Sequence, residues 1–273
     1  MLALAAVAGT AGAVGKKPDP ADAPASLGAV KSWAYQLQGA DLDALARAPT
    51  TPDHTSSTSE RAPSGEAGAV AEGEQPERWL SDTAPQWLHH ENERWSGNFL
   101  VHYWEPEWQQ LMFGKPGSYL ARIMAAGFDG VYLDRVDAYY EFLDERRTAA
   151  LEMVDFVSRL SAHARAERPG FLIVPQNGEE LLVNAGYVAA IDGIAKEDLL
   201  YGSPDEGEPN NPAQIANSQR WLSAAKAADK PVLVVEYLED AGKVAAAKAE
   251  LARLGYVATF APRALDRLVM PER

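Results

Sequence analysis

The chain has 273 residues, enough for one large domain, and 47% of them are hydrophobic, which is ample for a buried core. The formal net charge of −14 excludes a basic surface that could neutralise phosphates, so we expect no nucleic-acid partner. The absence of cysteine excludes disulfides and thiolate chemistry, and the five histidines lack metal-ligand spacing. We expect no metal and no cofactor, and we expect a monomer.

The chain opens on an apolar segment that is followed by a polar linker. Residues 1–15 are too short to span a bilayer, and Ala11-Gly12-Ala13 fits the small-residue pattern of a signal cleavage site. The basic residues that usually precede such a segment are missing, which leaves an alanine-rich arm as the alternative. We predict a signal-like segment and linker at residues 1–28, a single domain at 29–273, and a secreted protein with no membrane span.

The next two segments differ sharply in composition. WAYQLQG (33–39) predicts a first strand, on which Gln36 and Gln38 lie one alternation apart and so share a face. Residues 49–78 are instead rich in Pro, Ser, Thr, Gly and Glu and have no apolar run longer than Ala-Val. This low-complexity composition is typical of disorder and predicts no buried strand.

From residue 118 onward, predicted helices alternate with predicted strands. Continuous apolar runs predict buried strands, and apolar residues at helical spacing between a proline start and a glycine end predict helices. In chain order these are a helix at 118–127, a strand at 131–133, a helix at 145–168, a strand at 171–175, a strand within 191–198, a helix at 212–229, a strand at 232–237 and a helix at 241–255.

Polar residues collect where these strands end. Asp134 and Asp137 follow the first, Gln176-Asn177 the second, Glu197-Asp198 the third, and Glu236-Tyr237 the fourth. Barrel enzymes place their catalytic groups at the carboxyl ends of their strands. The fold class that we predict is therefore α/β, (β/α)8 TIM-barrel-like, and the low-complexity stretch lies where strands 2 and 3 of a complete barrel belong, which predicts an incomplete or gapped barrel there.

Several motifs in the same order resemble one known family. They are WAYQLQG (33–39), WSGNFLVHYWEPEWQ (95–109), GFDGVYLDRVDAY (127–139), IDGIAKEDLLYG (191–202) and GYVATFAPRALDRL (255–268). Together they resemble the endo-α-1,4-polygalactosaminidases, a family 114-type glycoside hydrolase. The resemblance implies a secreted barrel that cleaves α-1,4-linked galactosamine or N-acetylgalactosamine polysaccharide, with its catalytic carboxylates at Asp134 and Glu197.

The chemistry of glycoside cleavage agrees with that pair. One carboxyl group must be protonated to donate to the leaving oxygen, and the other must be ionised to attack the anomeric carbon or activate water. We expect Glu197 to be the acid. The alternatives are a helix cap for Asp134, a buried ion pair for Glu197, and a divalent-metal site at Asp134 and Asp137. Candidate substrate-binding residues are Gln36, Gln38, Tyr132, Asp137, Gln176, Asn177, Tyr201 and Glu236.

The low-complexity stretch at 49–78 departs from the family, which has two strands there. A shifted reading frame would produce this amino-acid composition, as would genuine divergence. The alternative function is therefore a catalytically inactive polysaccharide-binding barrel, or the product of a damaged gene.

Overall fold

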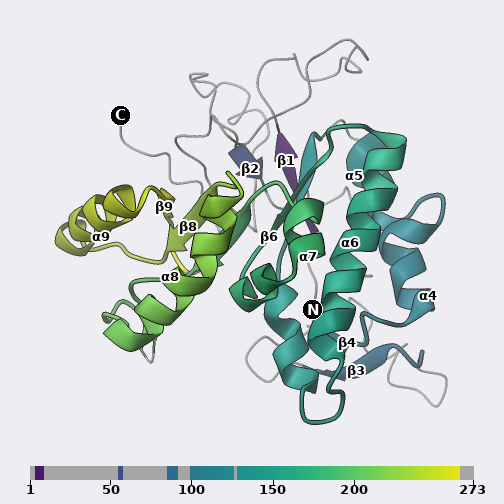
Figure 1. The fold of residues 1–273 in the computed structure, drawn as a ribbon, viewed down its shortest axis with the longest axis horizontal. Helices are drawn as coiled ribbons and strands as arrows, with labels where there is room; N and C mark the ends of the chain where they lie inside the picture. Colours follow the sequence, from purple (N-terminus) through teal and green to yellow (C-terminus); the bar gives the residue numbers. More distant parts are fainter. Residues whose placement is uncertain are drawn as a thin grey trace.

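The computed structural model describes residues 4–8, 55–57, 85–91, 99–125, 128–203 and 205–264. Five parallel strands in chain order form its centre (Figure 1): β5 (Gly130–Leu133), β6 (Leu172–Pro175), β7 (Ile194–Glu197), β8 (Val232–Glu236) and β9 (Val257–Phe260). β6 joins β7 through a parallel bridge between Gln176 and Ala195. Each strand thus lies beside the next one in the chain, as predicted for a (β/α) barrel. The described strands do not form a closed ring.

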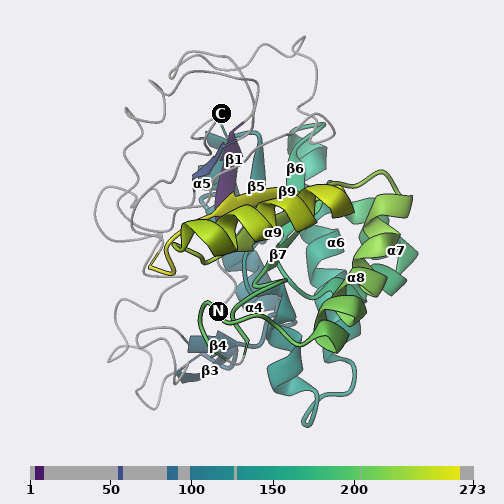
Figure 2. The same ribbon diagram turned by 90° about the vertical axis from the view of Figure 1, so that its left-hand side faces the viewer.

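Helices connect the parallel strands and cover their outer face. They are α6 (Ala149–Glu167), a 3₁₀ helix at Glu179–Val183 with α7 (Ala185–Ala190), α8 (Pro212–Ala227) and α9 (Ala241–Leu254). Figure 2 shows α9 crossing in front of the strands, and it packs on β9. The predicted helices and strands of this half are confirmed to within a few residues.

Side-chain caps explain where these helices begin and end. Asn211 accepts a hydrogen bond from the Ala213 amide at 2.8 Å, and Pro212 occupies the first turn of α8. Asp240 accepts one from the Lys243 amide at 2.8 Å at the start of α9, which ends at Gly255 in the left-handed region (φ 72°). These capping residues are local features of the sequence, so the ends of the helices are predictable from it.

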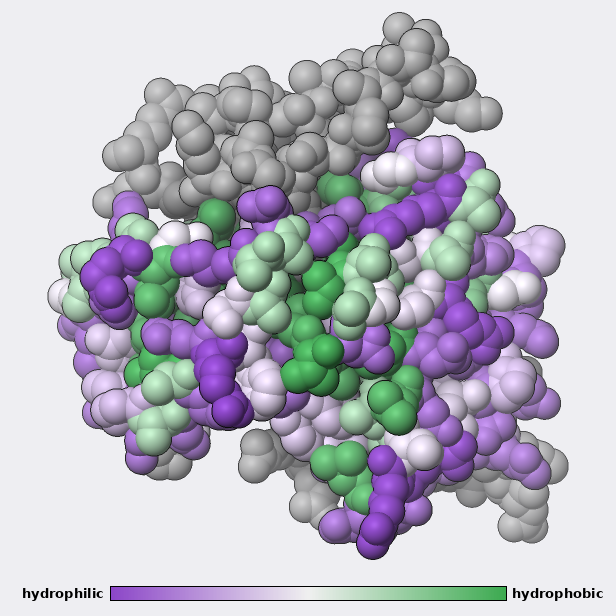
Figure 3. All heavy atoms as spheres, viewed as in Figure 1, coloured by the Kyte–Doolittle hydropathy of each residue, from purple (hydrophilic) through white to green (hydrophobic). Residues whose placement is uncertain are grey.

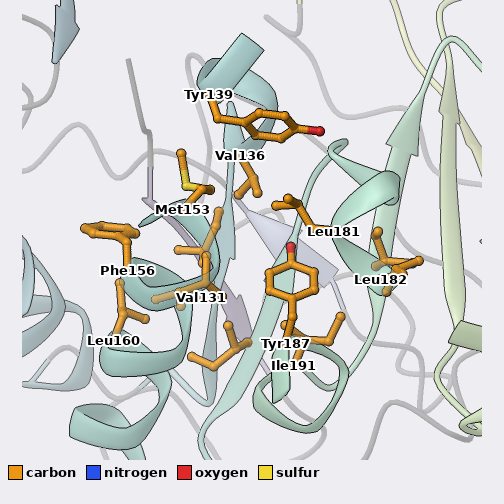
Figure 4. Close-up of a cluster of buried hydrophobic side chains, with 14 of the residues drawn as sticks. Val131, Val136, Tyr139, Met153, Phe156, Leu160, Leu181, Leu182, Tyr187 and Ile191 are labelled. Atoms are coloured by element: carbon orange, nitrogen blue, oxygen red, sulfur yellow. The ribbon is translucent and has the colours of Figure 1, made fainter. Parts of the chain in front are cut away.

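The alternating side chains of the strands build two separate apolar clusters. The outer cluster lies between the strands and the helices, where Met153, Phe156 and Leu160 of α6 face Val131 of β5 (Figure 4). The inner cluster lies on the opposite face of the strands and consists of Tyr132, Leu172, Val174, Ala195, Leu233, Val235, Tyr237 and Ala261. Strands buried on both faces account for the continuous apolar runs of the sequence.

On the edge of β5 that faces away from β6, the structure has antiparallel strands that the sequence did not predict. β1 (Leu4–Ala8) pairs antiparallel with β5, and β2 (Thr55–Ser57) pairs with β1. The low-complexity stretch therefore contributes one short strand, whereas we expected none. The predicted first strand at 33–39 lies outside the described residues, and the signal at 1–28 stays a prediction.

A second small sheet and several short helices precede β5. The strands β3 (Leu88–Glu91) and β4 (Phe99–Val101) form an antiparallel hairpin separate from the parallel strands. The chain then runs through α4 (Pro106–Gln109), a π-helix at Gln110–Gly114 and α5 (Tyr119–Ala125), and a 3₁₀ helix at Val136–Phe142 follows β5.

Figure 3 shows the surface of the molecule from the same side as Figure 1. Hydrophilic residues cover much of this surface, and hydrophobic residues gather toward its middle. In the described part of the chain, no helix combines the length and the apolar character that a membrane crossing requires.

Gly130 is required where β5 meets β6. A Cβ atom at this position would lie 2.5 Å from both the Cβ and the carbonyl oxygen of Leu172, its partner in register. Gly130→Ala should therefore force the strands apart and lower the free energy of unfolding by about 3 kcal/mol. Gly207→Ala is the control, because no atom lies within 4 Å of the added carbon there and only the left-handed backbone is penalised, by about 1 kcal/mol. Equal losses for both variants in urea unfolding would contradict this account.

Candidate active site

The inner face of the parallel strands carries the candidate site. Successive side chains on a strand alternate in direction, so residues two apart share a face. Two residues beyond Tyr132 of β5, Val174 of β6 and Ala195 of β7 lie, respectively, Asp134, Gln176 and Glu197, and at the end of β8 the inner cluster itself includes Tyr237. Four polar side chains from four neighbouring strands thus extend one apolar row.

Asp134 and Glu197 interact electrostatically across this face. Burial of the Asp134 carboxyl, and then the neighbouring charge of Glu197, raise the pKa of Asp134 to about 7. The backbone amide of Arg135 donates to Asp134 Oδ1 at 2.7 Å and opposes that rise. A carboxyl with such a pKa is protonated in about half of the molecules at pH 7 and can donate that proton.

Glu197 is held by two donors. The amide Nδ2 of Asn177 donates to its Oε1 at 3.1 Å, and the phenol of Tyr237 donates to its Oε2 at 3.0 Å. These two hydrogen bonds fix the position of both carboxylate oxygens of Glu197. The two carboxyls of the site therefore have contrasting surroundings, which is the arrangement used in acid and base pairs.

Asn177 fixes the end of β7. Its side-chain Oδ1 accepts hydrogen bonds from the backbone amide of Glu197 at 3.2 Å and from Lys196 Nζ at 3.3 Å. Its backbone amide donates to the Ala195 carbonyl at 2.9 Å. Its backbone is left-handed (φ 59°), a conformation that asparagine tolerates better than most residues. We predicted that Asn177 binds substrate, and the structure shows it bonded to Glu197.

The turns after β5, β6 and β7 share one backbone feature. The residues that follow the inward-facing polar residues, Arg135, Asn177 and Asp198, all have positive φ, at 57°, 59° and 51°. Sparsely populated backbone conformations cost free energy and gather at functional sites. Here they turn the chain sharply away immediately after each site residue.

Other predicted substrate-binding residues lie in or near the same row. Tyr132 is fully buried on the inner face, and burial raises its pKa. Gln176 is 1% exposed, and its Oε1 has no hydrogen-bond partner among the described residues. Burial also raises the pKa of Asp137, which lies near Arg135 with Nε 3.9 Å from its Oδ1.

Tyr201 and the predicted glutamines of the first strand do not extend the row. Tyr201 lies beyond β7, is bridged to Pro209 and packs partly on the outer cluster. Gln36 and Gln38 lie outside the described residues.

Glu236, a predicted substrate-binding residue, lies outside this row. It alternates with Val235, so it points to the outer face, where it is fully buried and accepts hydrogen bonds from the Leu200 amide at 2.8 Å and the Tyr201 amide at 3.2 Å. Burial raises its pKa to about 7. Glu236 thus holds the loop after β7, and the residue of this strand that reaches Glu197 is Tyr237, which the sequence analysis did not select. The period of two in VLVVEY was the signal that could have found it.

Among the described residues, acidic and imidazole side chains are not clustered for metal binding. Within the described ranges, no three His, Asp or Glu side chains converge on a point that could hold a metal ion. The oxygens of Asp134 and Asp137 therefore have no third such partner in that part of the chain.

Comparisons with known proteins agree with this geometry. Residues 65–272 match the Glycoside-hydrolase family GH114. An uncharacterized protein of Deinococcus radiodurans is 33% identical over 92% of this chain and 86% of its own length. The uncharacterized protein MJ1477 of Methanocaldococcus jannaschii is 34% identical over 77% of this chain and 67% of its own.

Among solved structures, the glycoside hydrolase domain of PelA from Pseudomonas aeruginosa is similar with a TM-score of 0.56. The superposition covers 74% of this chain and 75% of that one, at 20% sequence identity, and supports a TIM-barrel-like fold. The family match includes residues 65–78, part of the low-complexity stretch. The parallel strands, the carboxyl pair at their ends and the extent of the match lead to one conclusion: this chain belongs to glycoside-hydrolase family GH114.

Proposed function

We propose that this chain is an exported glycoside hydrolase that cleaves α-1,4-linked galactosamine or N-acetylgalactosamine polysaccharide with Asp134 and Glu197. The observation that carries the proposal is the raised pKa of Asp134, about 7, opposite a Glu197 held by two hydrogen-bond donors. One proton shared by two carboxyls is what cleavage of a glycosidic bond requires.

The assignment of roles within the pair involves a disagreement. From the sequence we expect Glu197 to be the acid. In the free protein, however, Glu197 accepts two hydrogen bonds, and burial raises the pKa of Asp134, which favours a proton on Asp134. Coupled carboxyls titrate as a pair, and the proton can sit on either member once substrate enters. We keep Glu197 as the acid in the proposal, as the sequence led us to expect, and azide rescue of the two single variants decides between the assignments.

The choice of polymer follows from the family resemblance and from charge. A net charge of −14 suits a polysaccharide that carries free amines. The loop after β7 adds the exposed carboxylates of Asp205, Glu206 and Glu208. Export rests on the apolar segment and the Ala11-Gly12-Ala13 pattern, and sequencing the N-terminus of the protein recovered from culture medium tests it.

The test of substrate is a panel of polysaccharides. Purified protein is incubated with fully acetylated and partly deacetylated α-1,4-galactosamine polymers, and with a β-linked glucosamine polymer as the control. We expect new reducing ends and shorter oligomers, read by mass spectrometry, from the α-linked polymers alone. Binding of the α-linked polymer without any cleavage would support the inactive binding barrel instead.

A further inference from the structure

Arg263 lies on the segment that follows β9 and contacts two residues at the edge of the site. Its Nη1 and Nη2 donate to the two carboxylate oxygens of Asp198 at 2.8 and 3.0 Å, a bidentate pair. Its guanidinium carbon lies 4.0 Å from the centre of the Tyr237 ring. One arginine therefore bridges the residue next to Glu197 in the chain and the phenol that donates to Glu197.

The contact with Tyr237 bears on its hydroxyl. Tyr237 is 7% exposed, and its hydroxyl donates to Glu197 Oε2 at 3.0 Å. A cation over the face of an aromatic ring is attracted to it and draws electron density from the ring. A phenol in that state is a stronger donor to an ionised carboxylate.

Asp198 is fixed from several directions, so its pair with Arg263 is not a loose surface contact. Its amide donates to the Val235 carbonyl at 3.0 Å, and its backbone is left-handed (φ 51°). Its carboxylate packs against Gly202, where an added Cβ atom would lie 2.6 Å from Asp198 Oδ1. These contacts restrict the side chain of Asp198, and its carboxylate in turn orients Arg263.

We propose that Arg263 is a positioning residue that acts through Asp198 and Tyr237 to hold the Glu197 carboxylate ready for proton transfer. The inference rests on the proposed function for its effect on turnover. Its effect on the titration of Glu197 does not depend on any substrate.

Other charged and titratable groups also face Glu197, and the test must separate them from Arg263. Only Tyr237 and Arg263 among them are changed in the variants below. Those that interact electrostatically with Glu197 are Tyr132 and Asp134 at β5, Asp137 on the following 3₁₀ helix, Tyr237 at β8 and Arg263 after β9.

The test combines Tyr237→Phe, Arg263→Ala and the double variant. The protein is labelled with ¹³C at its glutamate carboxyls, and the Glu197 signal is assigned by its loss in Glu197→Gln. We expect the midpoint of that signal to move to higher pH by about one unit in Tyr237→Phe, because an ionised carboxylate loses a donor. Arg263→Ala should move it in the same direction.

Turnover is measured on the same proteins. We expect kcat to fall about tenfold in Tyr237→Phe and in Arg263→Ala, with KM little changed, since positioning of a proton donor acts mainly in the transition state. Arg253→Ala is the control, because Arg253 also makes a bidentate pair, with Glu250, but lies on the exposed side of α9.

The double variant shows whether Arg263 acts through Tyr237. If Arg263 acts through the hydroxyl of Tyr237, then Arg263→Ala has a smaller effect on midpoint and kcat when residue 237 is already Phe. Full additivity of the two changes would overturn the proposal, as would an Arg263→Ala midpoint equal to that of the Arg253→Ala control. Tyr237→Phe keeps the ring, so its midpoint stays informative if Arg263→Ala fails to fold. A wild-type protein inactive on every polymer would sink the proposed function alone, because the titration needs no substrate.

Discussion

Asp134→Asn and Glu197→Gln should each lower kcat on an α-1,4-galactosamine polymer by about a thousandfold or more. Each change removes an ionisable oxygen at nearly constant size, so the loss reflects chemistry and not packing. Loss of transition-state stabilisation by about 4 kcal/mol corresponds to that factor. Reducing-end assays at saturating polymer measure it, and thermal unfolding checks that each variant folds. Retention of more than a tenth of the activity by either folded variant would remove that residue from the mechanism.

Azide assigns the roles within the pair. With a substrate that has a good leaving group, cleavage no longer needs an acid, and azide can take the place of the water that the same residue would activate as a base. If Glu197 is the acid, Glu197→Gln should be rescued by azide on such a substrate and Asp134→Asn should not. The reverse pattern would give the acid role to Asp134, as the hydrogen bonds of the free protein favour.

Asp134→Asn should also stabilise the fold at pH 8 but not at pH 4. The pKa of Asp134 is raised from an ordinary value of 3.8 to about 7, so the folded protein binds its proton more tightly than the unfolded chain. That contribution to stability is complete below pH 3.8 and is lost as pH rises through 7. The values differ by about three units, which sets an upper bound of about 4 kcal/mol on the loss at pH 8.

Urea unfolding at both pH values measures this effect. The variant cannot ionise at position 134, so its stability should exceed that of the wild type at pH 8 and match it at pH 4. Asp205→Asn is the control, because it removes an exposed carboxylate of the same kind from the loop after β7. An Asp134→Asn variant less stable than the wild type at pH 8 would show that the carboxylate is not destabilised by its surroundings.

Much of the C-terminal half could be predicted because its signals are local. Pro212 with Asn211 marks the start of α8, Gly255 marks the end of α9, and the apolar runs of β6 and β8 mark buried strands. Asp134 and Glu197 likewise stand at the ends of the predicted strands β5 and β7, and the resemblance to the family singled them out among the polar residues there.

The parts that escaped prediction depend on contacts between distant segments. Nothing in the apolar residues 4–8 distinguishes a strand between β2 and β5 from a leader, because the pairing partners decide. Arg263 lies 65 residues from Asp198 in the chain, and only the fold brings them together. Tyr237 was missed for a different reason, since the carboxylate of Glu236 drew attention away from the alternation that places Tyr237 on the inner face.

The central claim is that Asp134 and Glu197 work as one unit, and the double variant tests it most directly. The activities of the wild type, Asp134→Asn, Glu197→Gln and the protein with both changes are compared on the α-1,4-galactosamine polymer. Residues that act together lose about as much singly as jointly, so the double variant should be no more than about tenfold less active than either single one. Losses that multiply, so that the double variant falls by the product of the two, would show that the carboxyls act independently and would contradict the account.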